Sequence, residues 1–110
     1  MKEIKAVVRP AKLAALREAL RHVPGFPGMT VCKAEGCSAP SRHQPHTIKE
    51  ELTDFTPKVR VEIIAEDALA KILFDRIVDI ANTGHIGDGI VWVTAVERAS
   101  FVYKTMGVPD

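Results

Sequence analysis

The sequence predicts an α+β domain in which one four-stranded antiparallel sheet carries two helices on the same face. Two observations predict this class. Four short segments are rich in β-branched residues, and two further segments carry apolar residues at intervals of three and four, which is helical spacing. Their order is strand, helix, strand, long connection, strand, helix, strand. At 110 residues the chain is expected to form one domain, residues 1–110.

The first β-α-β unit begins with a strand at residues 3–9 (EIKAVVR), where polar and apolar residues partly alternate. Pro10 then opens a helix, because proline suits the first helical position. The apolar stripe of this helix consists of Leu13, Leu16, Leu20 and Val23. The segment 24–28, rich in Pro and Gly, ends the helix, and residues 29–35 form the second strand. A helical crossover fits parallel pairing of this strand with the first.

The second unit begins with a strand at residues 58–65 (KVRVEIIA), whose alternation buries one face and leaves the other polar. Asp67 is the predicted N-cap of the second helix, whose apolar stripe consists of Leu69, Leu73, Ile77 and Ile80. Residues 90–96 form the fourth strand, and residues 100–103 form a short strand in the weakly patterned tail, 97–110. Two such units in one sheet make the ferredoxin-like βαββαβ arrangement.

The sheet face that the helices leave open is predicted to be half apolar. Val7 and Ile64 fall on it at alternate strand positions, among polar residues. A face of this kind is usually covered by other copies of the chain, so we expect an oligomer.

The connection between the second and third strands is unusually long. Residues 37–54 show no sustained apolar periodicity and include two prolines and many charged residues. A long connection without secondary structure inside a compact domain is usually functional or disordered.

Composition excludes several classes of partner. The formal net charge of +1 gives no electrostatic reason to expect nucleic acid or an anionic membrane as a partner. No apolar run approaches the roughly 20 residues that span a bilayer, and no signal peptide is visible, so we expect a cytoplasmic protein. Two cysteines are too few for a disulfide framework.

The segment 83–89 (TGHIGDG) holds three glycines within seven residues, directly before the fourth strand. Two interpretations stay open. Gly84 suits a helix C-cap followed by a tight turn. Alternatively, glycines leave backbone N–H groups unshielded, and consecutive N–H groups can hold an anion such as phosphate.

Four blocks of the sequence together resemble the PII signal-transduction proteins, trimers that respond to cellular energy and to nitrogen or carbon status. The resemblance runs from Met1 to about Val96. The blocks are 9–20 (RPAKLAALREAL), 28–31 (GMTV), 54–59 (DFTPKV) and 83–89 (TGHIGDG).

The resemblance implies that ATP, ADP or AMP binds in clefts between subunits of a homotrimer. Val7, Glu62 and Ile64 would surround the adenine, and Gly87, Asp88 and Gly89 would present N–H groups to the phosphates. The implied nucleotide-binding set is completed by Thr30, Gly36, Cys37, Ser38, Lys58 and Lys104.

Several family features are replaced in this chain. Ile90 stands where the family usually has a lysine after Gly-Asp-Gly, which removes a charge-assisted hydrogen bond worth about 1.5–3 kcal/mol and weakens nucleotide binding. The family's loop, called the T-loop, often carries a modified tyrosine, whereas the one tyrosine here is Tyr103. The glutamine that helps the family bind 2-oxoglutarate has no clear counterpart around Ser38.

These features predict a non-enzymatic regulator rather than an enzyme. The T-loop, about residues 37–54, is expected to contact a partner protein, which the resemblance to divergent PII-like branches suggests is a membrane transporter.

Two other functions stay open. Cys37, His43 and His46 lie within ten residues of one another and are ligand types that soft divalent metals prefer, so a metal-responsive trimer linked to heavy-metal efflux is the main alternative. A small ferredoxin-like hydrolase is less supported, because no nucleophile and base are paired in the sequence.

Overall fold

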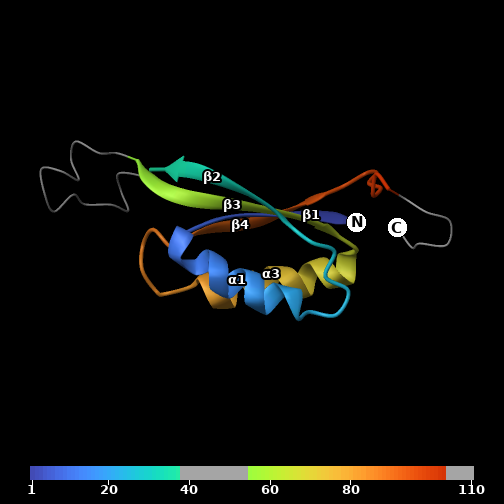
Figure 1. Cartoon of the computed structure of the whole chain (residues 1–110), viewed down its shortest axis with the longest axis horizontal. Helices are drawn as coiled ribbons and strands as arrows, with labels where there is room; N and C mark the ends of the chain where they lie inside the picture. The colour runs from blue at the N-terminus through green and yellow to red at the C-terminus, as the bar shows by residue number, and fades with distance from the viewer. Residues whose placement is uncertain (38–54, 104–110) are drawn as a thin grey trace, which may run out of the picture.

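The computed structural model describes residues 1–37 and 55–103. The predicted T-loop, apart from Cys37, and the end of the tail lie outside the described residues. Figure 1 shows a sheet with helices packed beneath it. The elements follow in the order β1 (Lys2–Val8), the 3₁₀ turn η1 (Pro10–Lys12), α1 (Leu13–Arg21), β2 (Thr30–Gly36), β3 (Thr56–Ala65), α3 (Asp67–Ala81) and β4 (Gly89–Ala95).

The sheet has the strand order β2-β3-β1-β4, and every neighbouring pair is antiparallel. This confirms the predicted α+β class and its four-stranded antiparallel sheet. The expected parallel pairing of the first two strands is wrong, because β3 lies between β1 and β2. The two strands do point the same way, as a helical crossover requires, but the crossover does not make them neighbours.

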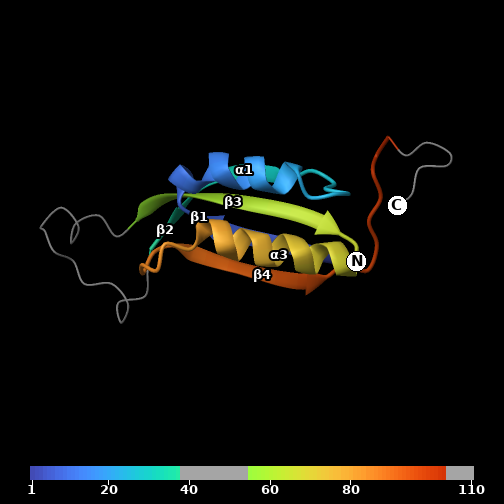
Figure 2. The same ribbon diagram turned by 90° about the horizontal axis from the view of Figure 1, so that it is seen from below.

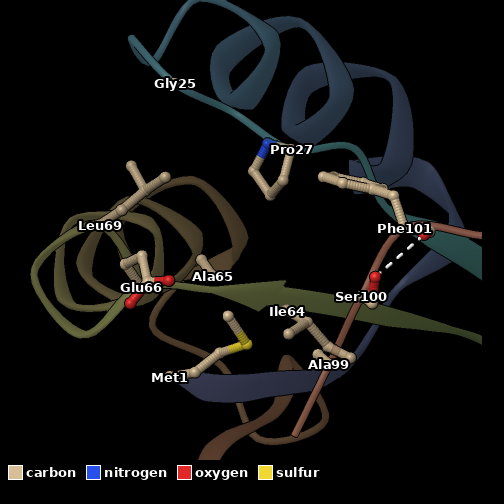
Figure 3. A pocket seen from close by; sticks show the side chains of 10 residues that line it. All are labelled: Met1, Gly25, Pro27, Ile64, Ala65, Glu66, Leu69, Ala99, Ser100 and Phe101. Carbon is tan, nitrogen blue, oxygen red and sulfur yellow. Dashed lines mark hydrogen bonds between the residues drawn. The ribbon is translucent and has the colours of Figure 1, made fainter. Parts of the chain in front are cut away.

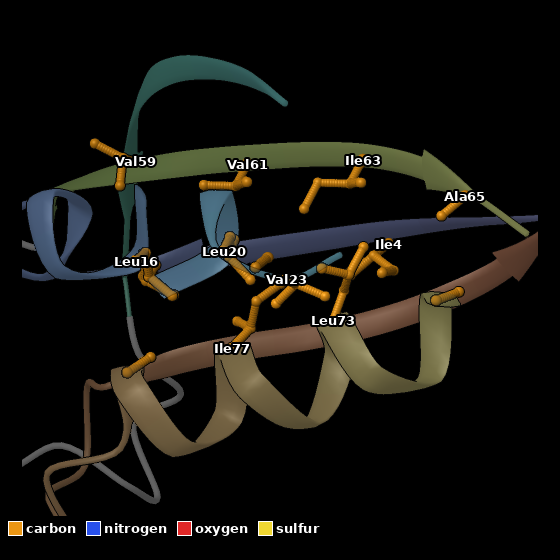
Figure 4. Packing of buried hydrophobic residues seen from close by; sticks show 14 residues of the cluster. Ile4, Leu16, Leu20, Val23, Val59, Val61, Ile63, Ala65, Leu73 and Ile77 are labelled. Carbon is orange, nitrogen blue, oxygen red and sulfur yellow. The ribbon is translucent and has the colours of Figure 1, made fainter. Parts of the chain in front are cut away.

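Both helices cover one face of the sheet, as Figure 2 shows from below. Alternate residues of β1 and β3 face them, beginning with Ile4 and Val59, because successive side chains of a strand point to opposite faces. Leu16 and Leu20 of α1, and Leu73 and Ile77 of α3, fill the space between the layers (Figure 4). Each of these side chains is at most 1% exposed, and burial of one contributes about 1.5–3 kcal/mol.

The start of each helix differs in detail from the sequence prediction. Pro10 does open the first helix, but as a single 3₁₀ turn before α1. Asp67 is not the N-cap of α3, because Glu66 occupies that position with extended backbone angles and makes no side-chain cap bond. Asp67 is instead the first helical residue, and its carboxylate lies 2.6 Å from the Met1 ammonium group.

The opposite face of the sheet is open in the single chain. Its rows follow from the register: Ile90, Val7 and Arg60 lie side by side, and the next row places Trp92 beside Lys5 and Glu62. Ile90 is 63% exposed. The face therefore mixes exposed apolar side chains with charged ones, as the alternation predicted.

The predicted strand at residues 100–103 is wrong. The last backbone hydrogen bond along β4 runs from the Val96 amide to the Met1 carbonyl, at 3.1 Å. Beyond it the chain leaves the sheet, and Phe101 and Tyr103 stack on each other with ring centroids 5.3 Å apart. A short segment of aromatic and β-branched residues forms no strand where it has no neighbouring strand to pair with.

Candidate functional site

The site is built on the turn between α3 and β4. The helix ends at Ala81 with Asn82 as its C-cap, so Gly84 is not the cap itself. The Asn82 side-chain oxygen accepts a hydrogen bond from the Gly84 amide at 2.8 Å, and Gly84 has a φ of +78°. The glycine thus follows the cap and lets the chain reverse toward β4.

Asp88 holds this turn together from within. Its carboxylate accepts hydrogen bonds from the Thr83 amide at 2.6 Å, from the Thr83 hydroxyl, and from the His85 amide at 3.3 Å. The hydrogen bonds from Thr83, with smaller contributions from Arg9 and His85, hold the pKa of the Asp88 carboxyl well below its usual range. Asp88 is therefore an ionised structural acceptor at neutral pH.

Two cations approach the turn from the sheet. The Arg9 guanidinium donates from Nε to Asp88 Oδ1 and from Nη2 to the Ile86 carbonyl, both at 3.2 Å. The Lys58 ammonium donates to the Gly87 carbonyl at 2.6 Å. Burial, and secondarily the positive charge of Arg9, lower the pKa of Lys58, while Asp88 opposes this shift. Lys58 is thus a partly desolvated cation held beside the turn.

Glycine is required at the end of the turn. Gly89 has a φ of +119°, and a Cβ there would lie 1.9 Å from the Val7 carbonyl oxygen. Gly87 has a φ of +98°, and its Cβ would lie 3.1 Å from Arg9 Nη2. Both positions combine a left-handed backbone with a close neighbour, so any side chain there would displace the turn or its contacts.

A cavity of about 420 Å³ opens beside these groups. It brings together many of the residues predicted to bind nucleotide, and its walls combine the Lys58 cation with apolar side chains. The lining consists of Val7, Gly36, Cys37, Lys58, His85, Ile86, Gly87, Asp88, Gly89 and Ile90.

Three predicted residues lie elsewhere on the sheet. Thr30 and Glu62 face each other across β2 and β3, and the Glu62 carboxylate pairs with Arg60 at 3.3 Å. Ile64 is six residues beyond Lys58 on β3, which is about 20 Å at the usual strand rise. Ser38 and Lys104 lie outside the described residues. The predicted set therefore divides into two groups within one chain.

Ile64 lines a second cavity of about 350 Å³ near the other end of the sheet. Figure 3 shows it between the segment before β2, the start of α3 and the tail, with Leu69, Met1 and Phe101 around it. Its lining is largely apolar, and Ser100 donates its hydroxyl to the neighbouring Phe101 carbonyl at 3.1 Å.

The metal prediction falls mostly outside the structure. Cys37 is an exposed free thiol beside the first cavity, whereas His43 and His46 lie outside the described residues. Residues 1–37 and 55–103 contain no group of three or more His, Cys, Asp or Glu side chains placed to hold a metal ion. The three-residue metal site stays a prediction.

Comparison with known proteins places this arrangement in a family. Residues 1–105 match the family model described as nitrogen regulatory protein P-II. The chain belongs to the P-II family. A P-II protein of Azospirillum brasilense is 41% identical over 99 residues, covering 89% of this chain and 88% of the relative. P-II proteins of Rhodospirillum rubrum and of Escherichia coli strain K12 are each 40% identical, covering 90% and 89% of this chain and 88% of each relative.

Membership of the P-II family confirms two predictions. The resemblance noted in the sequence is correct, and P-II proteins are signalling proteins rather than enzymes. This P-II protein is therefore a non-enzymatic regulator. Among the described residues, no helix has the length and apolar character needed to cross a membrane.

Sequence reasoning missed one important residue of this P-II site. Arg9 was recognised as part of a family block, but not as a contact of the glycine turn 79 residues away. In the structure Arg9 directly follows β1, and the turn directly precedes β4, the strand that pairs with β1. Strand adjacency had to be known before the two could be connected.

Proposed function

We propose that this P-II protein binds an adenine nucleotide in clefts between the subunits of a homotrimer, and controls a partner protein through its T-loop. The observation that carries the proposal is the convergence of Lys58 and Arg9 on the glycine turn, beside the cavity that the predicted phosphate-binding residues line.

The cavity offers an anion the right chemistry. Lys58 lines it, partly desolvated and with its ammonium group bonded to the turn at Gly87. Within the described residues, the Gly87 amide donates to no backbone carbonyl, so it can serve an incoming oxygen. Each charge-assisted hydrogen bond to phosphate would contribute about 1.5–3 kcal/mol. The apolar side chain of Val7 would lie against the uncharged part of the ligand.

A cleft between subunits would reconcile the two groups of predicted residues. Within one chain, Ile64 lies about 20 Å along β3 from Lys58, too far for both to contact adjacent parts of one nucleotide. If the base contacts of one subunit meet the phosphate contacts of the next, the two groups become a single site. The open sheet face, with Ile90 and Trp92 exposed, supports such assembly.

The base of the T-loop adjoins the same cavity. Gly36 and Cys37, the residue before the loop and its first residue, line it, and the Thr56 hydroxyl donates to the Gly36 carbonyl at 3.3 Å. A ligand there contacts both strands from which the loop emerges. Ligand state could thus bias the loop's affinity for a partner, for which a membrane transporter is our proposal.

Calorimetry with ATP, ADP and AMP tests nucleotide binding. We expect binding by the wild type and a loss of about tenfold or more in affinity in Lys58→Met, with no change in Lys71→Met, whose exposed lysine lies on α3. If none of the three nucleotides binds at millimolar concentration, the nucleotide proposal is wrong.

The partner proposal has its own test. Membranes from the source organism are incubated with the wild type and with a variant in which residues 38–52 are replaced by a short glycine linker. We expect the wild type alone to retain a transporter, with retention changing when ADP replaces ATP. Equal retention of the same proteins by both would show that the T-loop is not the contact.

A further inference from the structure

We propose that Arg9 is a positioning residue of this site, which holds the turn between α3 and β4 in its binding conformation through Asp88 and Ile86. The expected effect of Arg9 on nucleotide affinity rests on the proposed nucleotide function. Its effect on the turn is independent of any ligand.

The sheet register explains why Arg9 can act in this way. The last backbone pair of the β1–β4 ladder joins Val8 to Gly89. Arg9 and Asp88 are the next residues on each strand, so they occupy the row directly beyond the ladder. Where backbone pairing ends, an ion pair from Arg9 Nε to Asp88 Oδ1, 3.2 Å long, takes its place.

A single guanidinium reaches two acceptors of the turn. Arg9 Nη2 donates to the Ile86 carbonyl at 3.2 Å while Nε binds Asp88. The planar fork of arginine fixes both contacts at once, which a lysine ammonium on a flexible stem does less well. The outer end of the turn is therefore fixed to β1 at two points.

Asp88 transmits this restraint to the rest of the turn. The Thr83 amide and hydroxyl and the His85 amide all donate to its carboxylate, and Lys58 is the other charged side chain near it among the described residues. A carboxylate occupied in this way acts inside the protein rather than on a ligand. Because Arg9 orients this carboxylate, it also positions Thr83 and His85, which are hydrogen-bonded to it.

Gly87 lies beneath the same guanidinium. A Cβ at this position would meet Arg9 Nη2 at 3.1 Å, so the guanidinium lies against Gly87, whose amide makes no backbone hydrogen bond within residues 1–37 and 55–103. Loss of Arg9 would free both the carbonyl of Ile86 and the backbone around Gly87. The predicted phosphate contact would then have to be ordered when the ligand binds, which costs affinity.

The first experiment needs no ligand. Amide hydrogen exchange is measured by NMR in the wild type, Arg9→Gln, Arg9→Lys and the control Arg17→Gln, whose arginine is exposed on α1. We expect exchange at Thr83 and His85 to become about tenfold faster in Arg9→Gln, to be partly restored in Arg9→Lys, and to stay unchanged in the control. Amides of Ile4 and Leu73 in the core report whether the fold is intact. Unchanged exchange at Thr83 and His85 in Arg9→Gln would overturn the proposal.

A double-mutant cycle then separates positioning from direct contact. If Arg9 acts through Asp88, Arg9→Gln and Asp88→Asn each weaken ADP binding about tenfold, and the double variant is no weaker than either. Additive losses would mean that Arg9 contacts the ligand itself and is not a positioning residue. Failure of the wild type to bind ADP would refute the proposed nucleotide function, while the exchange comparison would still decide the role of Arg9.

Discussion

The replacement of Gly89 by alanine is the most direct test of the geometry at the start of β4. An added Cβ would lie 1.9 Å from the Val7 carbonyl oxygen, 2.9 Å from the Val7 carbonyl carbon and 3.1 Å from Val8 Cα. All three neighbours are backbone atoms of the central strand β1, so no side chain can rotate to make room. The two strands must separate by more than an ångström at this pair.

Two costs add at this position. A non-glycine residue at the observed φ of +119° is strained by about 1–2 kcal/mol, and forcing a methyl group into a packed contact costs about 1–3 kcal/mol more. We therefore expect Gly89→Ala to lower the free energy of unfolding by about 3 kcal/mol. At about 4 °C per kcal/mol for a domain of this size, Tm falls by about 12 °C.

Gly84→Ala is the matched control, because Gly84 also has a positive φ, +78°, but its Cβ would meet nothing within 4 Å. Its expected cost is the backbone strain alone, about 1 kcal/mol, or about 4 °C. Both variants are melted at one protein concentration, followed by circular dichroism, since assembly makes Tm depend on concentration. Equal Tm values for the two variants would refute the close approach of Gly89 to β1.

Three further outcomes follow from the packing and the site. Leu73→Ala, at a fully buried position, should cost about 2–5 kcal/mol in denaturant unfolding, whereas Ile72→Ala, 51% exposed on the same helix, should cost less than about 1 kcal/mol. ADP affinity measured by calorimetry should fall as pH rises through the lowered pKa of Lys58. The reason is that a bound anion raises the pKa of Lys58, so binding above the pKa of the free site takes up a proton. The variant Lys58→Arg should show no such loss of affinity at alkaline pH. Ile90→Lys should raise the affinity for ATP about tenfold and the affinity for AMP much less. An equal rise in affinity for both nucleotides would contradict the placement of residue 90 near the terminal phosphates.

The sequence predicted the elements of the fold because their periodicities report buried faces directly. Val59, Val61 and Ile63 alternate along β3 and are all buried, and Leu73 and Ile77 recur at helical spacing and lie in the core. The order of the strands in the sheet was harder to predict from the sequence. A helical crossover fixes the direction of the next strand but not its neighbour, so the insertion of β3 between β1 and β2 could not be derived from the first unit alone.

The sequence predicted the local part of the site, the glycine turn, but not the contacts that distant residues make with it. The glycine turn stands out within seven residues, and positive φ values at Gly84, Gly87 and Gly89 agree with it. Its contacts with Arg9 and Lys58 join residues that are 77 and 29 positions apart, and local sequence carries no trace of them. Asp67 failed as a predicted cap because a preference for a residue type at helix starts does not say which neighbouring residue takes the position.

The contacts of the turn also change how anion binding at this site should be understood. Glycine-rich turns are expected to offer N–H groups, yet the cations here are bound to carbonyls, Lys58 to Gly87 and Arg9 to Ile86. If phosphate draws the Lys58 ammonium toward itself, the Gly87 carbonyl loses a hydrogen bond while the ligand gains one. The net free energy of that contact is then smaller than the full value of a charge-assisted bond. Such an exchange would favour modest affinity, and it would make the conformation of the turn depend on whether the proposed ligand is bound, which is how a ligand could control this regulator.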